Sequence, residues 1–248
     1  MIKLTVHLLR TFLIVLFLKS SALAQKIKDD SLFVAQVTEN ITNNYLILLK
    51  SDAPIFNGKM YRPNSNFDEG THTLFINNQY TLGSIFYDGI LYKDMNIMYD
   101  LVLDQLILLN FDKVGGLVVF PHRVKSFKLH EHTFINIQPD SLNKKNISSG
   151  YYDLLVEGKV NFLAKRSKKI QETTNQEKVK RIVYQQDKYF LLKDDIYYSI
   201  KNKNELLKQL KVTHDQNQQY IKSNKLKFKK NKEESMIRLV KFHDSINL

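Results

Sequence analysis

Short strand-like segments divided by tight turns run from Ser84 to Ile200, and they constrain the fold of this 248-residue chain more than any other feature. Asp88-Gly89 is the usual two-residue signal for a β-hairpin, because both residues accept the positive φ angles of a type I′ turn. Glu157-Gly158 and Lys193-Asp194-Asp195 separate two further pairs of such segments. Strands at this spacing predict an antiparallel sheet that is strongly curved or partly barrel-like.

The apolar pattern has a helical period on both sides of the predicted sheet. Residues 31–49 repeat apolar side chains at near-fourfold spacing, which is typical of one helix face. Towards the C-terminus, Asn202 with Glu205 and Asn231 with Glu234 each form an Asn-x-x-Glu pair. Such a pair can satisfy two free backbone N–H groups at a helix start, so each predicts a helix.

These patterns together predict the fold class and the domain organisation. The class is α+β, with a curved antiparallel β-meander, an N-terminal helix and C-terminal helices. We predict one domain over residues 25–248, with the sheet at about 84–200 and basic helices at about 202–246.

Four aspartates, Asp88, Asp94, Asp100 and Asp104, lie within one stretch of the predicted sheet. A calcium-loop pattern that begins at Asp94 lacks a ligand at position 5, Gly at position 6 and Glu at position 12. We predict that Asp88 lies in a hairpin turn, Asp94 and Asp104 in strand connections, and Asp100 after a strand end. Asp is favoured there because its side chain bonds nearby N–H groups. A glycosidase carboxylate pair is the catalytic alternative.

The best metal candidate is the pair His130 and His132 in His130-Glu131-His132. In a strand these two imidazoles point to the same face, as two metal ligands must. A zinc site needs three or four ligands, and His122 on a neighbouring strand is a possible third. The alternative is a polar strand end whose imidazoles face solvent or bond a backbone group.

Other catalytic templates are absent from the sequence, and no cofactor is predicted. It contains no G-x-S-x-G, no H-E-x-x-H, and neither of the glycine-rich phosphate-binding patterns. The predicted strands are rich in tyrosine, within a total of 13 Tyr and 15 Phe. These rings are either a carbohydrate- or lipid-contacting surface or, as is more common, the filling of a sheet face.

The N-terminus predicts export. Lys3 and Arg10 precede and flank the short apolar run TFLIVLFL, and Ala22-Leu23-Ala24 is a cleavage pattern, so residues 1–24 read as a signal peptide. No later run is long enough for a membrane span. The chain has no Cys, which excludes disulfides, thiol catalysis and a lipid-modified N-terminal cysteine. We predict the periplasm or cell surface of a Gram-negative bacterium.

Of the net charge of +12, the predicted signal peptide carries +3, and the basic charge of the remaining chain lies in its C-terminal part. Residues 159–188 hold 9 Lys or Arg and 3 Asp or Glu, and residues 201–248 hold 12 and 5. Such a surface favours anionic partners or is simply solvated. Export and the scarcity of Arg make nucleic acid an improbable partner.

Several short motifs spread over residues 32–246 resemble one group of proteins. They are Phe56-Asn57-Gly58 with Tyr61, Tyr87-Asp88-Gly89 with Tyr92, Tyr99-Asp100-Leu101, His132-Thr133-Phe134, Gly150-Tyr151-Tyr152 with Glu157-Gly158-Lys159, and Asn224-Lys225-Leu226-Lys227-Phe228. The chain is similar in these motifs to uncharacterised exported proteins of Gram-negative bacteria. The resemblance implies one folded unit and no known activity.

The leading functional hypothesis is a non-enzymatic cell-envelope protein that binds a partner protein or a small apolar ligand between sheet and helices. One alternative is a metal-assisted hydrolase that uses His130 and His132. The other is a protein that binds an anionic envelope surface through residues 201–232.

Overall fold

A computed structural model describes residues 48–63, 67, 71–138, 147–175, 178–210 and 214–246, with the isolated positions 34, 37, 41 and 45. The chain divides into two units, Met1–Lys50 and Ser51–Leu248. The predicted signal peptide, residues 1–24, lies outside the described residues. So does most of the helix predicted at 31–49, although all six described positions between 34 and 49 are helical. None of the described helices combines the length and the hydropathy that a membrane span requires.

The second unit is built on the predicted antiparallel meander. Its main sheet has 11 strands in the order β1-β5-β4-β3-β2-β6-β7-β8-β9-β12-β13, and the two end strands leave it open rather than closed as a barrel. The strands are β1 Lys59–Met60, β2 Thr81–Tyr87, β3 Ile90–Asp100, β4 Gln105–Leu109, β5 Gly116–Val118, β6 Val124–Leu129, β7 His132–Ile137, β8 Gly150–Val156, β9 Asn161–Lys165, β12 Lys188–Lys193 and β13 Ile196–Ile200. Short 3-10 helices span Lys50–Asp52, Pro54–Phe56 and Pro121–Arg123.

Local turn chemistry explains much of this register. Tyr87 pairs with Ile90, so Asp88 and Gly89 alone form the turn, with φ angles of 49° and 80°. Asp194 and Asp195 make a similar turn, with φ angles of 51° and 59°. Both hairpins confirm the sequence prediction, because type I′ turns require positive φ at two positions. The Glu157-Gly158 segment likewise joins β8 to β9, which pair antiparallel.

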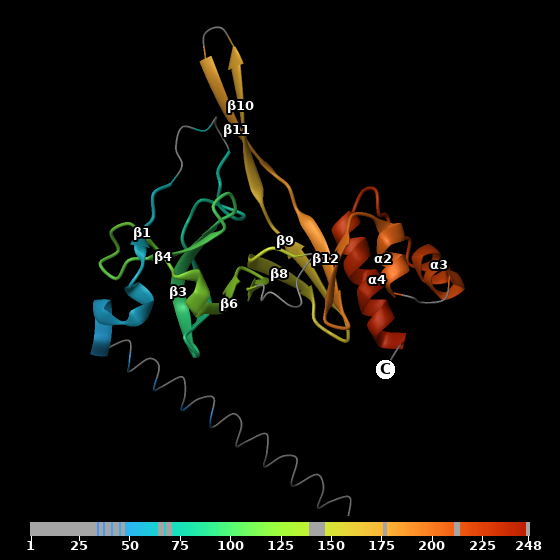
Figure 1. Cartoon of the computed structure of the whole chain (residues 1–248), viewed down its shortest axis with the longest axis horizontal. Coiled ribbons are helices and arrows are strands. Elements are labelled where there is room, and N and C mark those ends of the chain that lie inside the picture. Colours follow the sequence, from blue (N-terminus) through green and yellow to red (C-terminus); the bar gives the residue numbers. More distant parts are fainter. Residues whose placement is uncertain are drawn as a thin grey trace, which may run out of the picture. The chain divides into compact units, whose positions relative to one another are not determined.

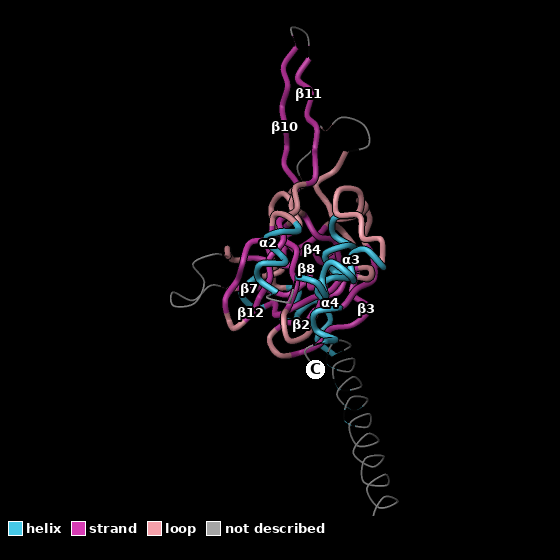
Figure 2. Tube along the Cα trace, turned by 90° about the vertical axis from the view of Figure 1, so that its right-hand side faces the viewer, coloured by secondary structure: helices cyan, strands magenta, loops and turns pink. Residues whose placement is uncertain are grey.

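One pair of strands was not predicted. The segment 165–187, read from the sequence as a charged connection, contains β10 Lys168–Asn175 and β11 Lys178–Gln185. They pair with each other over their whole length and with no strand of the main sheet. Figures 1 and 2 show this hairpin extending away from the main sheet, between β9 and β12.

The C-terminal helices α2 Lys203–Leu210, α3 His214–Ser223 and α4 Lys232–Ile246 form the second layer. Their buried side chains share one hydrophobic cluster with β8, β9, β12 and β13, so the contact between helices and sheet is a packed core. At the start of α2 the Asn202 side-chain oxygen accepts a hydrogen bond from the Glu205 N–H at 3.0 Å, and Glu205 accepts one from the Lys201 N–H at 2.7 Å. This confirms the predicted N-terminal cap of α2.

Aromatic side chains form the interior of the sheet in the middle of the chain. Tyr87, Tyr99, Phe127, Phe134 and Tyr151 are fully buried. The Phe127 ring stacks on Phe134 with centroids 4.7 Å apart and meets Tyr151 edge-on at 5.1 Å. Such pairs add about 0.5–1.5 kcal/mol each beyond their burial. Of the two predicted roles for the aromatic rings, these residues therefore have the second: they fill a sheet face.

Candidate partner-binding arm

The β10–β11 hairpin, residues 168–175 and 178–185, is here named the arm. Residues directly opposite each other in an antiparallel pair lie on the same face, and faces alternate along each strand. One face, named the basic face, therefore carries Lys169, Gln171, Thr173, Lys180, Ile182 and Tyr184. The opposite face carries Ile170, Glu172, Thr174, Val179, Arg181 and Val183.

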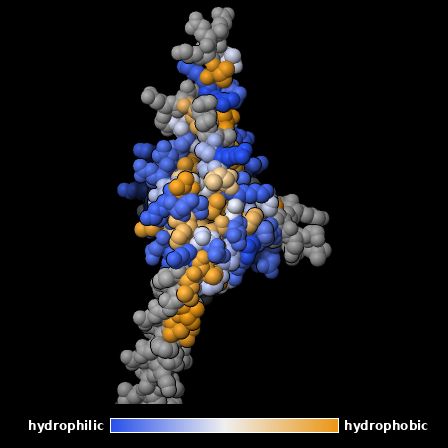
Figure 3. All heavy atoms as spheres, turned by 90° about the vertical axis from the view of Figure 1, so that its left-hand side faces the viewer, coloured by the Kyte–Doolittle hydropathy of each residue, from blue (hydrophilic) through white to orange (hydrophobic). Residues whose placement is uncertain are grey.

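The arm exposes apolar side chains on both faces. Val179, Ile182 and Tyr184 are 59%, 46% and 42% exposed. In Figure 3 the end of the molecule that carries the arm shows hydrophobic atoms between hydrophilic ones. An isolated two-stranded hairpin is at best marginally stable in water, because it has no core of its own. The arm must therefore be held by its attachment to the rest of the unit.

The attachment is centred on one guanidinium group. Arg166 lies between β9 and β10 and is only 6% exposed. Its Nε and Nη2 atoms donate to the Asp153 Oδ2 of β8 at 2.9 and 2.7 Å. Its Nη1 atom donates at 2.7 Å to Asp187, which lies between β11 and β12. The two ends of the arm are therefore joined to each other and to the sheet.

The same guanidinium reaches the helical layer. Arg166 donates to both carboxylate oxygens of Glu233, in the first turn of α4, at 2.6 and 2.9 Å. Burial alone would lower the pKa of Arg166, but hydrogen bonds to Glu233 and Asp187 and the charge of Asp153 outweigh it, so the pKa is raised. We name Asp153, Arg166, Asp187 and Glu233 the root. The Arg166–Glu233 pair is bidentate and the Arg166–Asp153 pair is buried, and each of these features fixes geometry more strongly than a single contact at the surface does.

Lys168 forms a second attachment beside the root. Its Nζ atom donates to the backbone oxygens of His72 and Leu74 at 2.9 and 2.7 Å. Its backbone N–H donates to the Leu101 oxygen at 3.2 Å. Burial lowers the pKa of Lys168, and the charge of Asp100 partly opposes that effect. The first residue of the arm is thus bound to the β3–β4 turn and to the segment before β2.

The four aspartates of the sequence analysis do not meet at one site. Asp88 lies in its predicted hairpin turn and pairs with Arg123. Asp94 was predicted in a strand connection, but it lies inside β3 with a φ of 54°, opposite the register shift of β2. That prediction was wrong, because a bulge lets one long strand continue where the sequence suggests two. Asp104 lies in the predicted β3–β4 connection.

Asp100 and Asp104 instead hold the β3–β4 turn. Asp100 is the last residue of β3 and fully buried, and its carboxylate accepts hydrogen bonds from Tyr61, Thr73 and two turn N–H groups. Asp104 accepts from the Tyr99 hydroxyl and from Lys165 Nζ, each at 2.5 Å. Every partner here stabilises the turn, so the arrangement explains these carboxylates without a catalytic role.

The histidine pair is placed differently from the sequence expectation. Leu129 pairs with His132, so His130 and Glu131 form the β6–β7 turn, and His130 has a φ of 52°. The prediction that both imidazoles project from one strand face was wrong, because the two-residue turn takes His130 out of the strand. His132 Nδ1 lies 2.7 Å from Asp153 Oδ2, which joins it to the root. In the described part of the chain, no three His, Cys, Asp or Glu side chains form a group that could hold a metal.

No pattern in the sequence predicts that Arg166, Asp153, Asp187 and Glu233 form a group. Arg166 is separated by 13 residues from Asp153 and by 67 from Glu233, so no local motif contains them. The available signal was the run Val179-Lys180-Arg181-Ile182-Val183-Tyr184, which is rich in the β-branched and aromatic residues that strands favour. It indicates the strand β11, and such a strand needs a second strand with which to pair.

Similarity to known proteins does not indicate the function of this chain. Comparison of the chain with models of protein families, with curated proteins and with solved structures found no match. The arm and its root must therefore be interpreted from their own chemistry.

Proposed function

We propose that this chain is an exported, non-enzymatic protein of the cell envelope that binds a partner protein through the arm. One observation carries the proposal: an exposed hairpin without a core is fixed at its base by a buried ionic cluster. A fixed binding element loses little conformational entropy on association, which increases affinity. The export part rests on the signal-peptide pattern of residues 1–24.

The basic face favours an acidic partner. Lys169 and Lys180 are exposed on it and make no ion pair with a described residue. Glu172, the acidic residue that β10 contributes, lies on the opposite face and pairs with Arg181 at 2.8 Å. Ile182 and Tyr184 stand between the lysines and supply the apolar and aromatic contact that interfaces use. A second copy of this face would bring lysines together, so charge disfavours self-association through it.

The free strand edges favour a polypeptide over a lipid or a polysaccharide. Neither β10 nor β11 pairs with a further described strand, so each leaves one row of backbone N–H and C=O groups open. Only another peptide chain matches that row in strand geometry. We therefore infer an acidic, extended segment of a protein as the partner.

A designed strand peptide tests this chemistry. The probe is a peptide of alternating Glu and Val with the length of β10, 8 residues, and its control replaces Glu by Lys. We expect the acidic peptide to bind, measured by fluorescence anisotropy, and its affinity to fall as salt rises. The double variant Lys169→Glu/Lys180→Glu should lose that binding and gain affinity for the basic peptide. Equal binding of both peptides, or of neither, would contradict the proposal.

The metal-assisted hydrolase remains as a second proposal because of one contact. Asp153 accepts from His132 Nδ1, and a carboxylate in that position orients the other imidazole nitrogen, Nε2, for a metal. This second proposal predicts a stoichiometric metal that is lost in His132→Ala, measured by elemental analysis of protein purified without chelator. Metal that stays in His132→Ala would exclude this site.

Two further predictions concern the helical layer. The first is a small apolar ligand between sheet and helices. In that region the structure has the packed cluster of Leu206, Met236 and Leu239. Binding of an anionic envelope surface through residues 201–232 stays a prediction, and salt-dependent binding to anionic vesicles would test it.

A further inference from the structure

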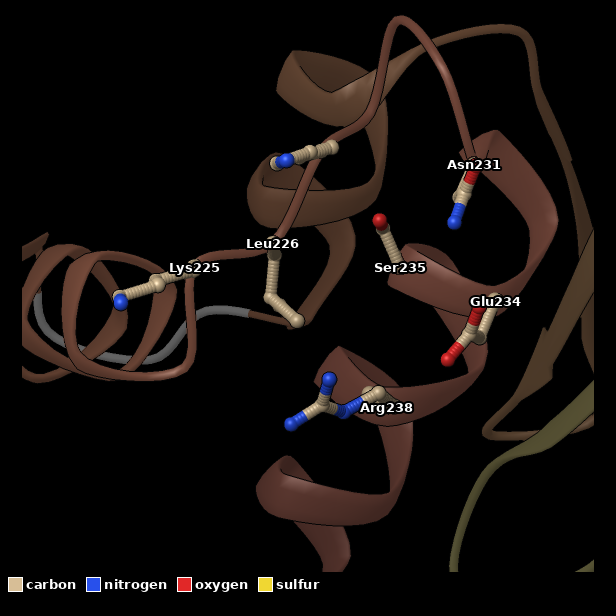
Figure 4. Close-up of a pocket in the computed structure, with 7 residues that line it drawn as sticks. Lys225, Leu226, Asn231, Glu234, Ser235 and Arg238 are labelled. Carbon is tan, nitrogen blue, oxygen red and sulfur yellow. The ribbon is translucent and has the colours of Figure 1, made fainter.

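A cavity of about 300 Å³ lies among the C-terminal helices, away from the arm. Its wall is formed by the segment after α3 and by the start of α4: Lys225, Leu226, Lys227, Asn231, Glu234, Ser235 and Arg238. Figure 4 shows the polar side chains of Asn231, just before α4, and of Glu234, Ser235 and Arg238 in α4 along one side of the cavity, with Leu226 on the other. The volume is at the lower end for ligand sites and suits one small, sugar-sized group.

Ser235 is the first sign that the cavity takes a ligand. The residue is only 3% exposed, and its hydroxyl points into the cavity. Its backbone N–H bonds the Asn231 oxygen at 3.0 Å, but its hydroxyl has no hydrogen-bond partner among the described residues. Ser235 Oγ is not among the fully buried atoms that lack a partner, so it is open to the cavity and can bond a group from outside the chain.

The start of α4 is the second sign, because it differs from the start of α2. Both helices begin with Asn-x-x-Glu, and in α2 the pair caps the backbone. In α4 the same two residues, Asn231 and Glu234, make no such bonds with described groups and line the cavity instead. An amide and a carboxylate are therefore available to a ligand.

Arg238 is the third sign. It lies one turn after Glu234, at the spacing where such pairs usually form a salt bridge. Instead, Arg238 donates to the Asn224 side-chain oxygen at 3.0 Å, and the described contacts include no ion pair with Glu234. Glu234 and Arg238 thus enter the cavity as separate charges. A ligand must satisfy a cation and an acceptor at the same time.

We propose that this cavity binds one anionic sugar unit. Its carboxylate or phosphate accepts hydrogen bonds from Arg238 and Ser235, with Lys225 and Lys227 adding positive charge at the rim. Its hydroxyls donate to Glu234 and to the Asn231 oxygen, while Leu226 packs on the C–H face of the ring. A bare anion fits less well, because it has no donor for the Glu234 carboxylate. The site is independent of the arm and its partner.

Three probes separate the sources of the acid group. Glucuronate carries a carboxylate, glucose 6-phosphate carries a phosphate, and glucose carries neither. In calorimetric titrations of the mature protein, we expect at least one acidic sugar to bind at least about tenfold more tightly than glucose. Preference for glucuronate assigns a uronic acid, and preference for glucose 6-phosphate assigns a phosphorylated sugar. Equal affinity for all three, or binding of none, would overturn the proposal.

Variants of the cavity complete the test. Arg238→Gln should weaken binding of the preferred sugar by at least about tenfold, and Ser235→Ala by about fivefold, the loss of one hydrogen bond. Leu226→Phe fills the cavity and should abolish binding without removing a charge. Arg181→Gln, on the arm, is the matched control and should leave binding unchanged. Circular dichroism checks that each variant is folded, and unchanged affinity in folded Arg238→Gln and Leu226→Phe would refute the site.

Discussion

Arg166 in the root and Arg181 in the arm show how differently these two regions are built. Arg166 is 6% exposed and bonds three carboxylates, those of Asp153, Asp187 and Glu233. Arg181 is 41% exposed and pairs with Glu172 alone, across the arm. The buried cluster sets where the arm begins, whereas the exposed pair contributes little to stability. The root therefore fixes the base of the arm, while the side chains on both faces of the arm stay available to a partner.

Removing the root should have the largest effect. Arg166→Ala leaves Asp153, which is 1% exposed, without its main partner, and we expect the free energy of unfolding to fall by about 3–5 kcal/mol. Arg181→Ala is the matched control and should lower it by at most about 1 kcal/mol. Urea unfolding followed by circular dichroism measures both. Similar losses in the two variants would remove the distinction between root and arm.

Replacing Asp100 should have the next largest effect on the free energy of unfolding. Asp100→Ala leaves the Thr73 hydroxyl and the N–H groups of Val102 and Leu103 without their acceptor, which should lower the free energy of unfolding by about 2–3 kcal/mol. Asp112→Ala removes a similar turn contact, to the Val114 N–H, at an exposed position, and should change it by less than about 1 kcal/mol. An equal effect of the two substitutions in urea unfolding would show that burial of the β3–β4 turn is unimportant.

High pH should weaken the sheet through its tyrosines. Burial raises the pKa of Tyr99 and Tyr151. Above pH 10 the unfolded chain therefore loses phenol protons that the folded chain keeps, so stability falls as pH rises. Each such tyrosine contributes about 1.4 kcal/mol per pH unit. Burial lowers the pKa of Lys165 and of Lys168, which acts in the opposite direction until unfolded lysines lose their protons near pH 10.5.

Tyr151→Phe isolates one of these groups. The Tyr151 hydroxyl is buried without a hydrogen-bond partner in the described structure, so its removal should change stability by less than about 1 kcal/mol at neutral pH. Urea unfolding between pH 9 and pH 11 should then show a shallower decline than the unchanged protein. A decline of the same steepness would mean that Tyr151 ionises in the folded state.

The smallest effect is expected on the arm itself. Ile182→Ser and Tyr184→Ser should change the free energy of unfolding by no more than about 0.5 kcal/mol, because both side chains are exposed. Hydrogen exchange should be faster in the arm than in β3 or β8, since two strands without a core open easily. A large loss of stability in either variant would indicate that the arm packs on this chain rather than on a partner.

Local chemistry explains which parts of the fold are predictable. The hairpins at Asp88-Gly89 and Asp194-Asp195 follow from turn residues, and the α2 cap follows from Asn202 and Glu205. The arm was not predicted because β10 is polar and the sequence between β10 and β11 contains no Gly or Pro. The root could not be predicted, since Arg166 and its carboxylates meet only after the sheet and α4 have assembled. The prediction that His130 and His132 lie on one strand face was wrong because a two-residue turn places His130 outside the strand.

The most direct test of the binding arm is site-specific photo-crosslinking in the native cell, with a photoreactive amino acid at position 182 on the basic face or at position 174 on the opposite face. The account predicts that position 182 crosslinks to another protein through an acidic segment, that position 174 does so far less, and that Lys169→Glu/Lys180→Glu removes the product. Crosslinks of equal yield from both faces, a product with the mass of two copies of this chain, or adducts only to lipid or polysaccharide would contradict it.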